Sequence, residues 1–349
     1  MNTNKAKKRN EAIDFLRGCA CVCIILIHTA WWSGNDYLPG WFKNAFLFFD
    51  VPMFMFLAGL SYHYIESVGK NIKGILKQWN KWVFFLLFYY AIIIIFFRSE
   101  FNPRNIVNSI FYLMPVEGSL KVIPGSLWFI FMYIQVTILC SIILYFYNTK
   151  KSPIEFKHIL IFMFFLTVIN LPFVDSNIAI YSFLYLLGYY SYKNKINSTK
   201  ILILLEMAMI VLAVIVFKIS GYGITDIQML KGPVTVYYLL ISIPSILLIW
   251  FLKDRIKKSP SKLISYIGKN AIFFYYAQGI SSSLIFFIYP HLNISNIYLR
   301  FCHMALFNIV MGITIGIIIN ELYNLSYKLI TKIKLKLLNN KKKKKIRKN

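Results

Sequence analysis

The sequence predicts an all-α, polytopic integral membrane protein with about ten transmembrane helices and both termini on the cytoplasmic side. Hydrophobic residues occupy 58% of the 349 positions and charged residues only 15%, whereas soluble domains are roughly half apolar and a quarter charged. Apolar runs of spanning length, about 17–25 residues, recur along the whole chain. The distribution of basic residues between these runs then gives their orientation.

The apolar runs are separated by short polar loops. In chain order, the expected helices cover 12–32, 44–65, 80–98, 124–147, 158–174, 178–192, 201–219, 233–252, 264–289 and 303–325. The fifth and sixth helices are short, and only Asp175–Asn177 separates them. The loop at 99–123 is long for a connector, which indicates a lid or a re-entrant segment.

The first run imitates a signal peptide, because basic residues precede the apolar stretch Gly18–Ile27. Asp14 and Arg17 interrupt the approach to that stretch, and no clean small-residue cleavage site follows it. We therefore interpret the segment as a retained first transmembrane helix.

Basic residues alternate between the two sides of the predicted membrane. With the N-terminus inside, the inner loops and tails hold 30 Lys and Arg, and the outer loops hold 7. By the positive-inside rule this ratio supports ten spans. We assign 1–330 to a transmembrane domain and 331–349 to a basic cytoplasmic tail near anionic membrane lipid. The net charge of +26 is explained by this distribution, so no nucleic-acid partner is expected.

Ionisable residues within a span are costly and are therefore candidates for function. The first helix carries Asp14, Arg17 and His28. Eleven helical steps from Arg17 to His28 leave a net rotation of about 20° and an axial separation of roughly 16 Å. Both side chains thus share one face, and Asp14 can pair with Arg17 three residues away.

The predicted topology places Arg17 near the cytoplasm and His28 towards the outer side. This arrangement suits an elongated anionic ligand that enters from the cytosol, with phosphates at Arg17 and its reactive end at His28. Simpler explanations exist for both residues. Arg17 can extend its charge to the inner interface, and His28 can serve as a hydrogen-bonded packing residue between helices.

Five short segments together resemble a known family. Asp14–Gly18 reads DFLRG, and ten residues separate Arg17 from His28. Further segments follow in order: VPMFMFLAGLSYHY from Val51, GSLWFIFMY from Gly125, YSFLYLLGYYSYK from Tyr181 and SYIGKNAIFFYYAQG from Ser265. Together these segments span about 270 residues. They resemble the motifs of acyltransferase family 3, the membrane-bound O-acetyltransferases of surface polysaccharides.

The resemblance implies ten helices in the bacterial cytoplasmic membrane and transfer of an acyl group, usually acetyl from acetyl-CoA, to a sugar hydroxyl of a surface or lipid-linked glycan. It makes Arg17 and His28 required positions. Lys77 and Lys81 stand where the family has a basic stretch before its third helix, so they are expected to meet CoA phosphates. Ordinary positive-inside lysines would look the same. No tightly bound cofactor and no metal site are expected.

The chain departs from the family pattern at Ala58, which replaces serine, at Gln278, which replaces histidine, and at Asp50. We expect Asp50 either to orient His28 or to face water at the interface. His28 is expected to act as general base or to carry the acyl group itself. The indole of Trp128 is a candidate for contact with the substrate oxyanion.

A secondary transporter is the alternative class. In that case Arg17, His28, Asp50 and Glu206 would line a proton or substrate path. The sequence shows no evident inverted repeat, a feature that is common in transporters.

Overall fold

The computed structural model describes residues 10–34, 37–65, 68–112, 120–149, 155–169 and 175–346, and every regular element in these ranges is a helix. The helices are α1 (Glu11–Trp32), α2 (Gly40–Ala45), α3 (Pro52–Tyr62), α4 (Val68–Phe96), α5 (Pro103–Tyr112), α6 (Val122–Ser126), α7 (Phe129–Thr149), α8 (Phe156–Ile169), α9 (Ser176–Ser191), α10 (Thr199–Ser220), α11 (Val236–Leu252), α12 (Lys262–Lys269), α13 (Ala271–Ile288) and α14 (Ile297–Ile346). The predicted all-α class is confirmed.

Seven helical segments among the described residues are long and apolar enough to cross a membrane. They are 11–32, 40–62, 68–96, 122–149, 199–220, 271–291 and 297–337. The shorter helices α8, α9 and α11 occupy the other three predicted positions. The end of the fifth predicted helix, 170–174, and the basic N-terminal residues 1–9 lie outside the described residues. The count of ten spans and the side of each terminus stay predictions.

Two predicted helices are broken, and both breaks lie beside the candidate site. The second predicted helix divides at Asp50 into the 3-10 helix η1 (Phe46–Phe49) and α3. Pro52 occupies the first turn of α3, where a missing N–H costs nothing and the fixed φ favours a helix start. The ninth predicted helix divides at Asn270, which both ends α12 and begins α13.

Glycines at two helix crossings bring helix backbones into direct contact. A Cβ on Gly188 of α9 would lie 2.0 Å from the Phe56 carbonyl oxygen of α3, and one on Gly59 would lie 1.7 Å from that of Tyr185. Gly18 of α1 and Gly268 of α12 meet in the same way. Small residues permit such close approach between membrane helices, which explains why glycines recur in the family-like segments.

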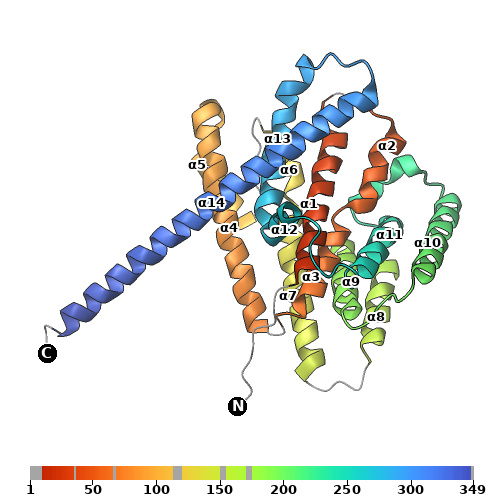
Figure 1. Ribbon diagram of the computed structural model, residues 1–349, viewed down its shortest axis with the longest axis horizontal. Coiled ribbons are helices and arrows are strands. Elements are labelled where there is room, and N and C mark those ends of the chain that lie inside the picture. Colours follow the sequence, from red (N-terminus) through yellow and green to blue (C-terminus); the bar gives the residue numbers. More distant parts are fainter. Residues whose placement is uncertain are drawn as a thin grey trace.

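The helix α1 lies at the centre of the molecule, with α12, α13 and α14 along one side of it (Figure 1). A buried polar network joins three of these helices. Asn308 of α14 donates to Thr29 Oγ1 of α1 at 2.9 Å and to Ser282 Oγ of α13 at 3.0 Å, and it accepts from Ser281 Oγ at 2.6 Å. This network holds the helical turn that carries His28.

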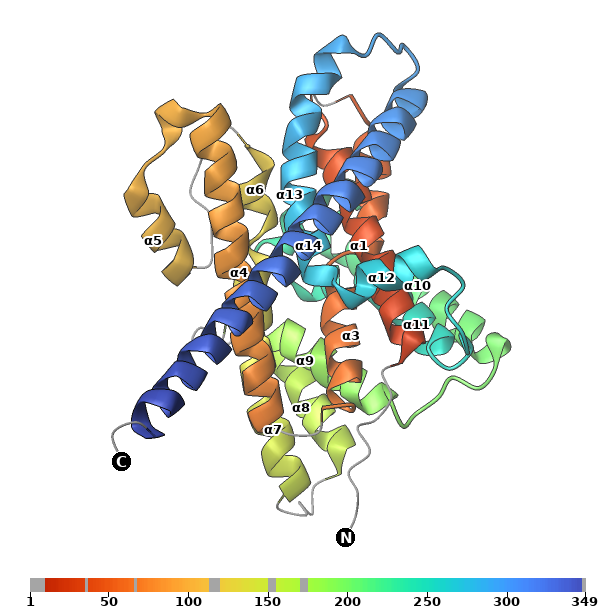
Figure 2. The same cartoon turned by 60° about the vertical axis from the view of Figure 1, so that its left-hand side comes forward.

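The periphery differs on the two sides of α1. Helix α10 packs mainly against α11. Only 6% of its apolar stretch is buried inside the protein, which leaves the rest of its surface for lipid. On the other side, α5 lies beside α4 (Figure 2). Two hydrogen bonds hold it there: Trp82 Nε1 of α4 donates to the Ser109 carbonyl of α5, and Tyr90 OH bonds to Ser109 Oγ. Helix α14 runs without a break through residues 330 and 331, the boundary that we predicted between the transmembrane domain and the tail.

Candidate active site

A cavity of about 480 Å³ lies between α1, α3, α4, α7 and the break between α12 and α13. Four basic residues line it: Arg17, Lys77, Lys81 and Lys269. Asp14 is the one carboxylate among the described lining residues. The structure therefore brings together every residue that the sequence suggested for contact with CoA, from helices that are separated by dozens of residues.

Arg17 occupies the junction of three helices. Its guanidinium donates to the Asp14 carboxylate at 3.2 Å, as predicted from their spacing. It also donates to Ser61 Oγ of α3 at 2.6 Å and to the Gly268 carbonyl of α12 at 3.4 Å. These partners fix the cation in place while it still lines the cavity, which is the arrangement that a positioned anion-binding group needs.

The other part of the lining is apolar and aromatic. Phe54 and Ala58 come from α3, Phe129 and Tyr133 from α7, and Tyr275 from α13. Ala58, one of the departures from the family pattern, gives this part of the cavity wall a methyl group. A cavity with one basic and one apolar region suits a ligand that carries both phosphates and an uncharged arm.

A buried ion pair lies nearer the expected outer side. The Asp50 side chain is 1% exposed, and its Oδ2 lies 2.5 Å from Lys231 Nζ. Tyr238 OH donates to the same oxygen at 2.6 Å, and the Val51 N–H donates to Oδ1 at 2.7 Å. Burial of a carboxylate requires such partners, and the break before α3 supplies the backbone donor.

His28 is half-buried on α1, close enough to Lys231 and Asp50 for both charges to act on its ring. We expected Asp50 either to orient His28 or to face water, and no hydrogen bond joins the two side chains in the described residues. Both Asp50 oxygens are bonded elsewhere, and His28 Nδ1 has no hydrogen-bond partner in the described part of the chain. A full positive charge competes better for the carboxylate than a neutral imidazole does, so Lys231 and not His28 is the ionic partner of Asp50.

Sequence reasoning missed Lys231 as a site residue, because it lies in a loop and looked like an ordinary outer lysine. The loop is anchored by Asn44 of α2, whose side chain donates to the Thr225 carbonyl at 3.2 Å and accepts from the Gln228 N–H at 3.1 Å. The 3-10 helix η4 (Met229–Lys231) then directs the lysine inwards. A signal was available, since intramembrane Asp50 needed a cation and the outer loops hold few.

Tyr275 connects the two regions. It lines the cavity, lies within electrostatic range of Asp50 and donates its hydroxyl proton to the Ser126 carbonyl. Tyr181 also lies near Asp50, and its buried hydroxyl lacks a partner within the described ranges. The cavity and the buried ion pair are therefore neighbours across a tyrosine wall.

Three other predicted positions lie outside the cavity lining as described. Trp128 packs against Tyr181 with ring centroids 6.3 Å apart, so it supports the tyrosine wall. Gln278 is 1% exposed, and neither atom of its amide has a partner among the described residues. Glu206 is on peripheral α10, apart from Arg17 and His28.

A family model described as an acyltransferase domain matches residues 10–321. This range begins at the residue that caps α1 and contains the whole cavity lining and the buried ion pair. No curated protein and no solved structure matches the chain.

Proposed function

Because this chain belongs to acyltransferase family 3, whose members transfer acyl groups, we propose that it moves an acetyl group from cytoplasmic acetyl-CoA to a carbohydrate hydroxyl. The acceptor is a cell-surface or lipid-linked glycan, and the protein acts in the bacterial cytoplasmic membrane. The observation that carries the proposal is the cavity in which Arg17, Lys77, Lys81 and Lys269 adjoin an apolar wall.

The donor follows from the chemistry of this cavity. The diphosphate of acetyl-CoA would meet the basic residues, where charge-assisted hydrogen bonds are strongest. Its pantetheine arm has no charge and would follow the apolar wall past Ala58 and Phe129. Tyr275 forms the end of that path, within electrostatic range of Asp50. An arm that follows the path would bring the thioester towards the region of His28.

His28 supplies the base in this proposal. The acceptor oxygen attacks the thioester carbonyl carbon while His28 takes the hydroxyl proton. The C–S bond then breaks, and His28 passes the same proton to the departing CoA thiolate, which leaves as the thiol. A base must be neutral before it acts. The Lys231–Asp50 pair places no net charge beside the imidazole. Transfer through an acyl-histidine is the alternative route at the same residue.

The test is O-acetylation of glycan in cells that carry the wild type, His28→Ala or Arg17→Ala. The matched controls are His158→Ala and Arg104→Ala, because both residues are exposed and lie outside the cavity. We expect loss of the acetyl ester in the first two variants and full ester in the controls, at equal amounts of membrane protein. An unchanged ester after deletion of the gene would refute the proposed activity.

A further inference from the structure

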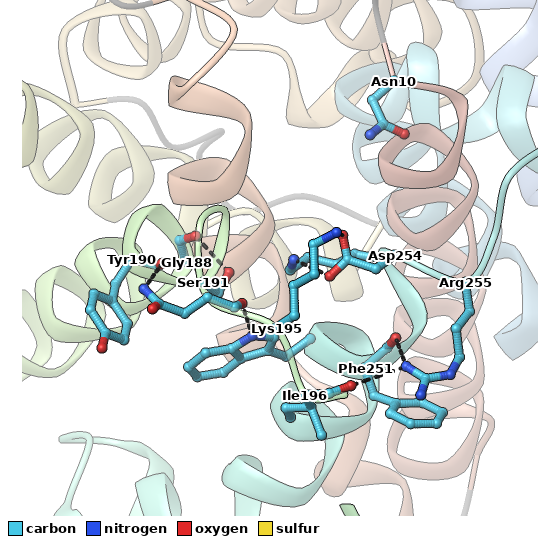
Figure 3. Close-up of polar contacts among 12 residues, drawn as sticks. Asn10, Gly188, Tyr190, Ser191, Lys195, Ile196, Phe251, Asp254 and Arg255 are labelled. Atoms are coloured by element: carbon cyan, nitrogen blue, oxygen red, sulfur yellow. Dashed lines mark hydrogen bonds and ion pairs between the residues drawn. The ribbon is translucent and has the colours of Figure 1, made fainter. Parts of the chain in front are cut away.

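A second cavity of about 320 Å³ lies beside the first, at the Asn10 end of α1. The first cavity accounts for Arg17 and the lysines of α4 and α12, but not for this space. The residues that give the second cavity its chemistry are Asn10, Tyr64, Tyr192, Lys195, Lys253 and Asp254. They come from α1, the end of α3, the end of α9 and the end of α11, and part of this group is shown in Figure 3.

The two cavities share a wall. Asn10, Ile13 and Tyr64 line both of them, and Asn10 Nδ2 donates to Tyr64 OH at 2.9 Å. A ligand that occupies the basic part of the first cavity therefore needs to pass only this pair to reach the second. Both cavities lie at the expected cytoplasmic end of α1, the side from which acyl-CoA arrives.

The charged groups of the second cavity surround one carboxylate. Lys253 Nζ lies 2.6 Å from Asp254 Oδ2, and Lys195 Nζ lies 3.9 Å from Oδ1. The Lys253 side chain is only 4% exposed, whereas that of Lys195 is 59% exposed at the rim. Two ammonium groups share one carboxylate, which leaves a net positive charge at the rim of the cavity, where Lys195 can pair with a second anion.

Neighbouring contacts hold these lysines in place. The Arg255 guanidinium donates to the carbonyls of Ile196, Phe251 and Asn197 at 3.2 Å each, and Trp250 Nε1 donates to the Asn194 carbonyl at 2.6 Å. Figure 3 shows Arg255 against Phe251 and Ile196, on the side of Asp254 away from Asn10. Arg255 thus fixes the loop that presents Lys195 and leaves the two lysines to meet a ligand.

The remaining wall is formed by the aromatic rings of Tyr64 and Tyr192 and by aliphatic Ile13 and Leu60. Tyr64 and Tyr192 meet edge to face with ring centroids 5.7 Å apart. A cavity with an aromatic wall and a cationic end fits a group that joins a ring to a phosphate, since rings pack on tyrosine and phosphates pair with ammonium.

We propose that this second cavity binds a phosphate monoester, namely the 3′-phosphate on the nucleotide end of acyl-CoA. The inference rests on the proposed function for the identity of the donor. The other source of the same chemistry is the headgroup of an anionic phospholipid at the cytoplasmic surface. The two sources differ in one respect that an experiment can use, because 3′-dephospho-CoA lacks only the phosphate in question.

The experiment measures Kd of the purified full-length protein in phosphatidylcholine nanodiscs for CoA and for 3′-dephospho-CoA. We expect the wild type to bind CoA about tenfold more tightly, the order of magnitude of one charge-assisted contact. Lys195→Gln and Lys253→Gln should reduce this ratio to about one to threefold while binding of 3′-dephospho-CoA stays unchanged. Lys193→Gln is the control, because Lys193 is an exposed residue on the same loop outside both cavities.

Each contrary result has its own meaning. Equal binding of the two nucleotides by the wild type would overturn the subsite and leave the proposed donor intact. Binding of neither would overturn the donor itself. Retention of dioleoylphosphatidate by the wild type but not by Lys195→Gln, with a nucleotide ratio of one, would assign the cavity to lipid and also overturn the proposal. Lys195→Gln decides the matter if Lys253→Gln fails to fold, because Lys195 is exposed.

Discussion

Replacing Lys231 with methionine would remove the cation from a carboxylate that is 1% exposed. The 2.5 Å separation corresponds to a gross attraction of about 7 kcal/mol at an effective dielectric constant of about 20. Desolvation of both ions offsets most of it, and breaking a buried pair from one side costs about 3–5 kcal/mol. Asp50 keeps its hydrogen bonds from Tyr238 and Val51. We therefore expect the free energy of unfolding to fall by about 3 kcal/mol, near the lower end of that range.

The assay is unfolding of the purified protein by SDS in mixed micelles, followed by tryptophan fluorescence. Four variants form the set: Lys231→Met, Asp50→Asn, the double variant and Lys218→Met. Lys218 is an exposed lysine at the end of α10, and its replacement should change the free energy of unfolding by less than about 0.5 kcal/mol. The loss of unfolding free energy in the double variant should be about 2 kcal/mol smaller than the sum of the two single losses, because the double variant leaves no unpaired charge.

Two results would refute this reasoning. One is a Lys231→Met protein as stable as the Lys218→Met control. The other is strict additivity of the two single losses, which would mean that Lys231 and Asp50 stabilise the fold independently of each other.

Three further predictions test the packing and the cavity. Gly188→Ala should cost about 1–3 kcal/mol in SDS unfolding, because its Cβ would lie 2.0 Å from the Phe56 carbonyl oxygen, whereas Gly74→Ala, with open space at that position, should cost nothing. Asn308→Leu should cost about 1–3 kcal/mol by leaving buried hydroxyls without a partner, and it should lower acyl transfer because Thr29 adjoins His28; equal activity would contradict that link. Lys81→Gln should weaken CoA binding about tenfold and reduce its dependence on salt, and an unchanged Kd in a titration at two ionic strengths would exclude Lys81 from the donor site.

The basic cavity was partly predictable from the sequence. Arg17 is near the start of the first predicted helix, Lys77 precedes the third and Lys81 is at its start, so the predicted orientation puts all three near the cytoplasm. Asp14 and Arg17 were expected to pair because a separation of three residues puts them on one helical face, and their 3.2 Å ion pair confirms this. These are local relations, which helical geometry and membrane depth determine.

The outer region was predicted less well. Asp50 was expected to orient His28 or to face water, and the structure pairs it with Lys231, 181 residues further along the chain. Nothing in the sequence near Lys231 distinguishes it from a surface lysine. Which lysine pairs with Asp50 depends on how α2 anchors the loop at 221–235, and that anchoring is a tertiary contact.

The sequence by itself determined the helical membrane class, the approximate places of the helices and the family, because the bilayer imposes a length and an apolar surface on every span. Only the tertiary structure decided which partners meet. It divided two predicted helices at Asp50 and Asn270, brought Gly59 and Gly188 to opposite helix backbones, and formed a second cavity from four separated segments. Periodicity reports which face of a helix is buried, whereas the partner on that face is set by helix crossings that a linear pattern does not encode.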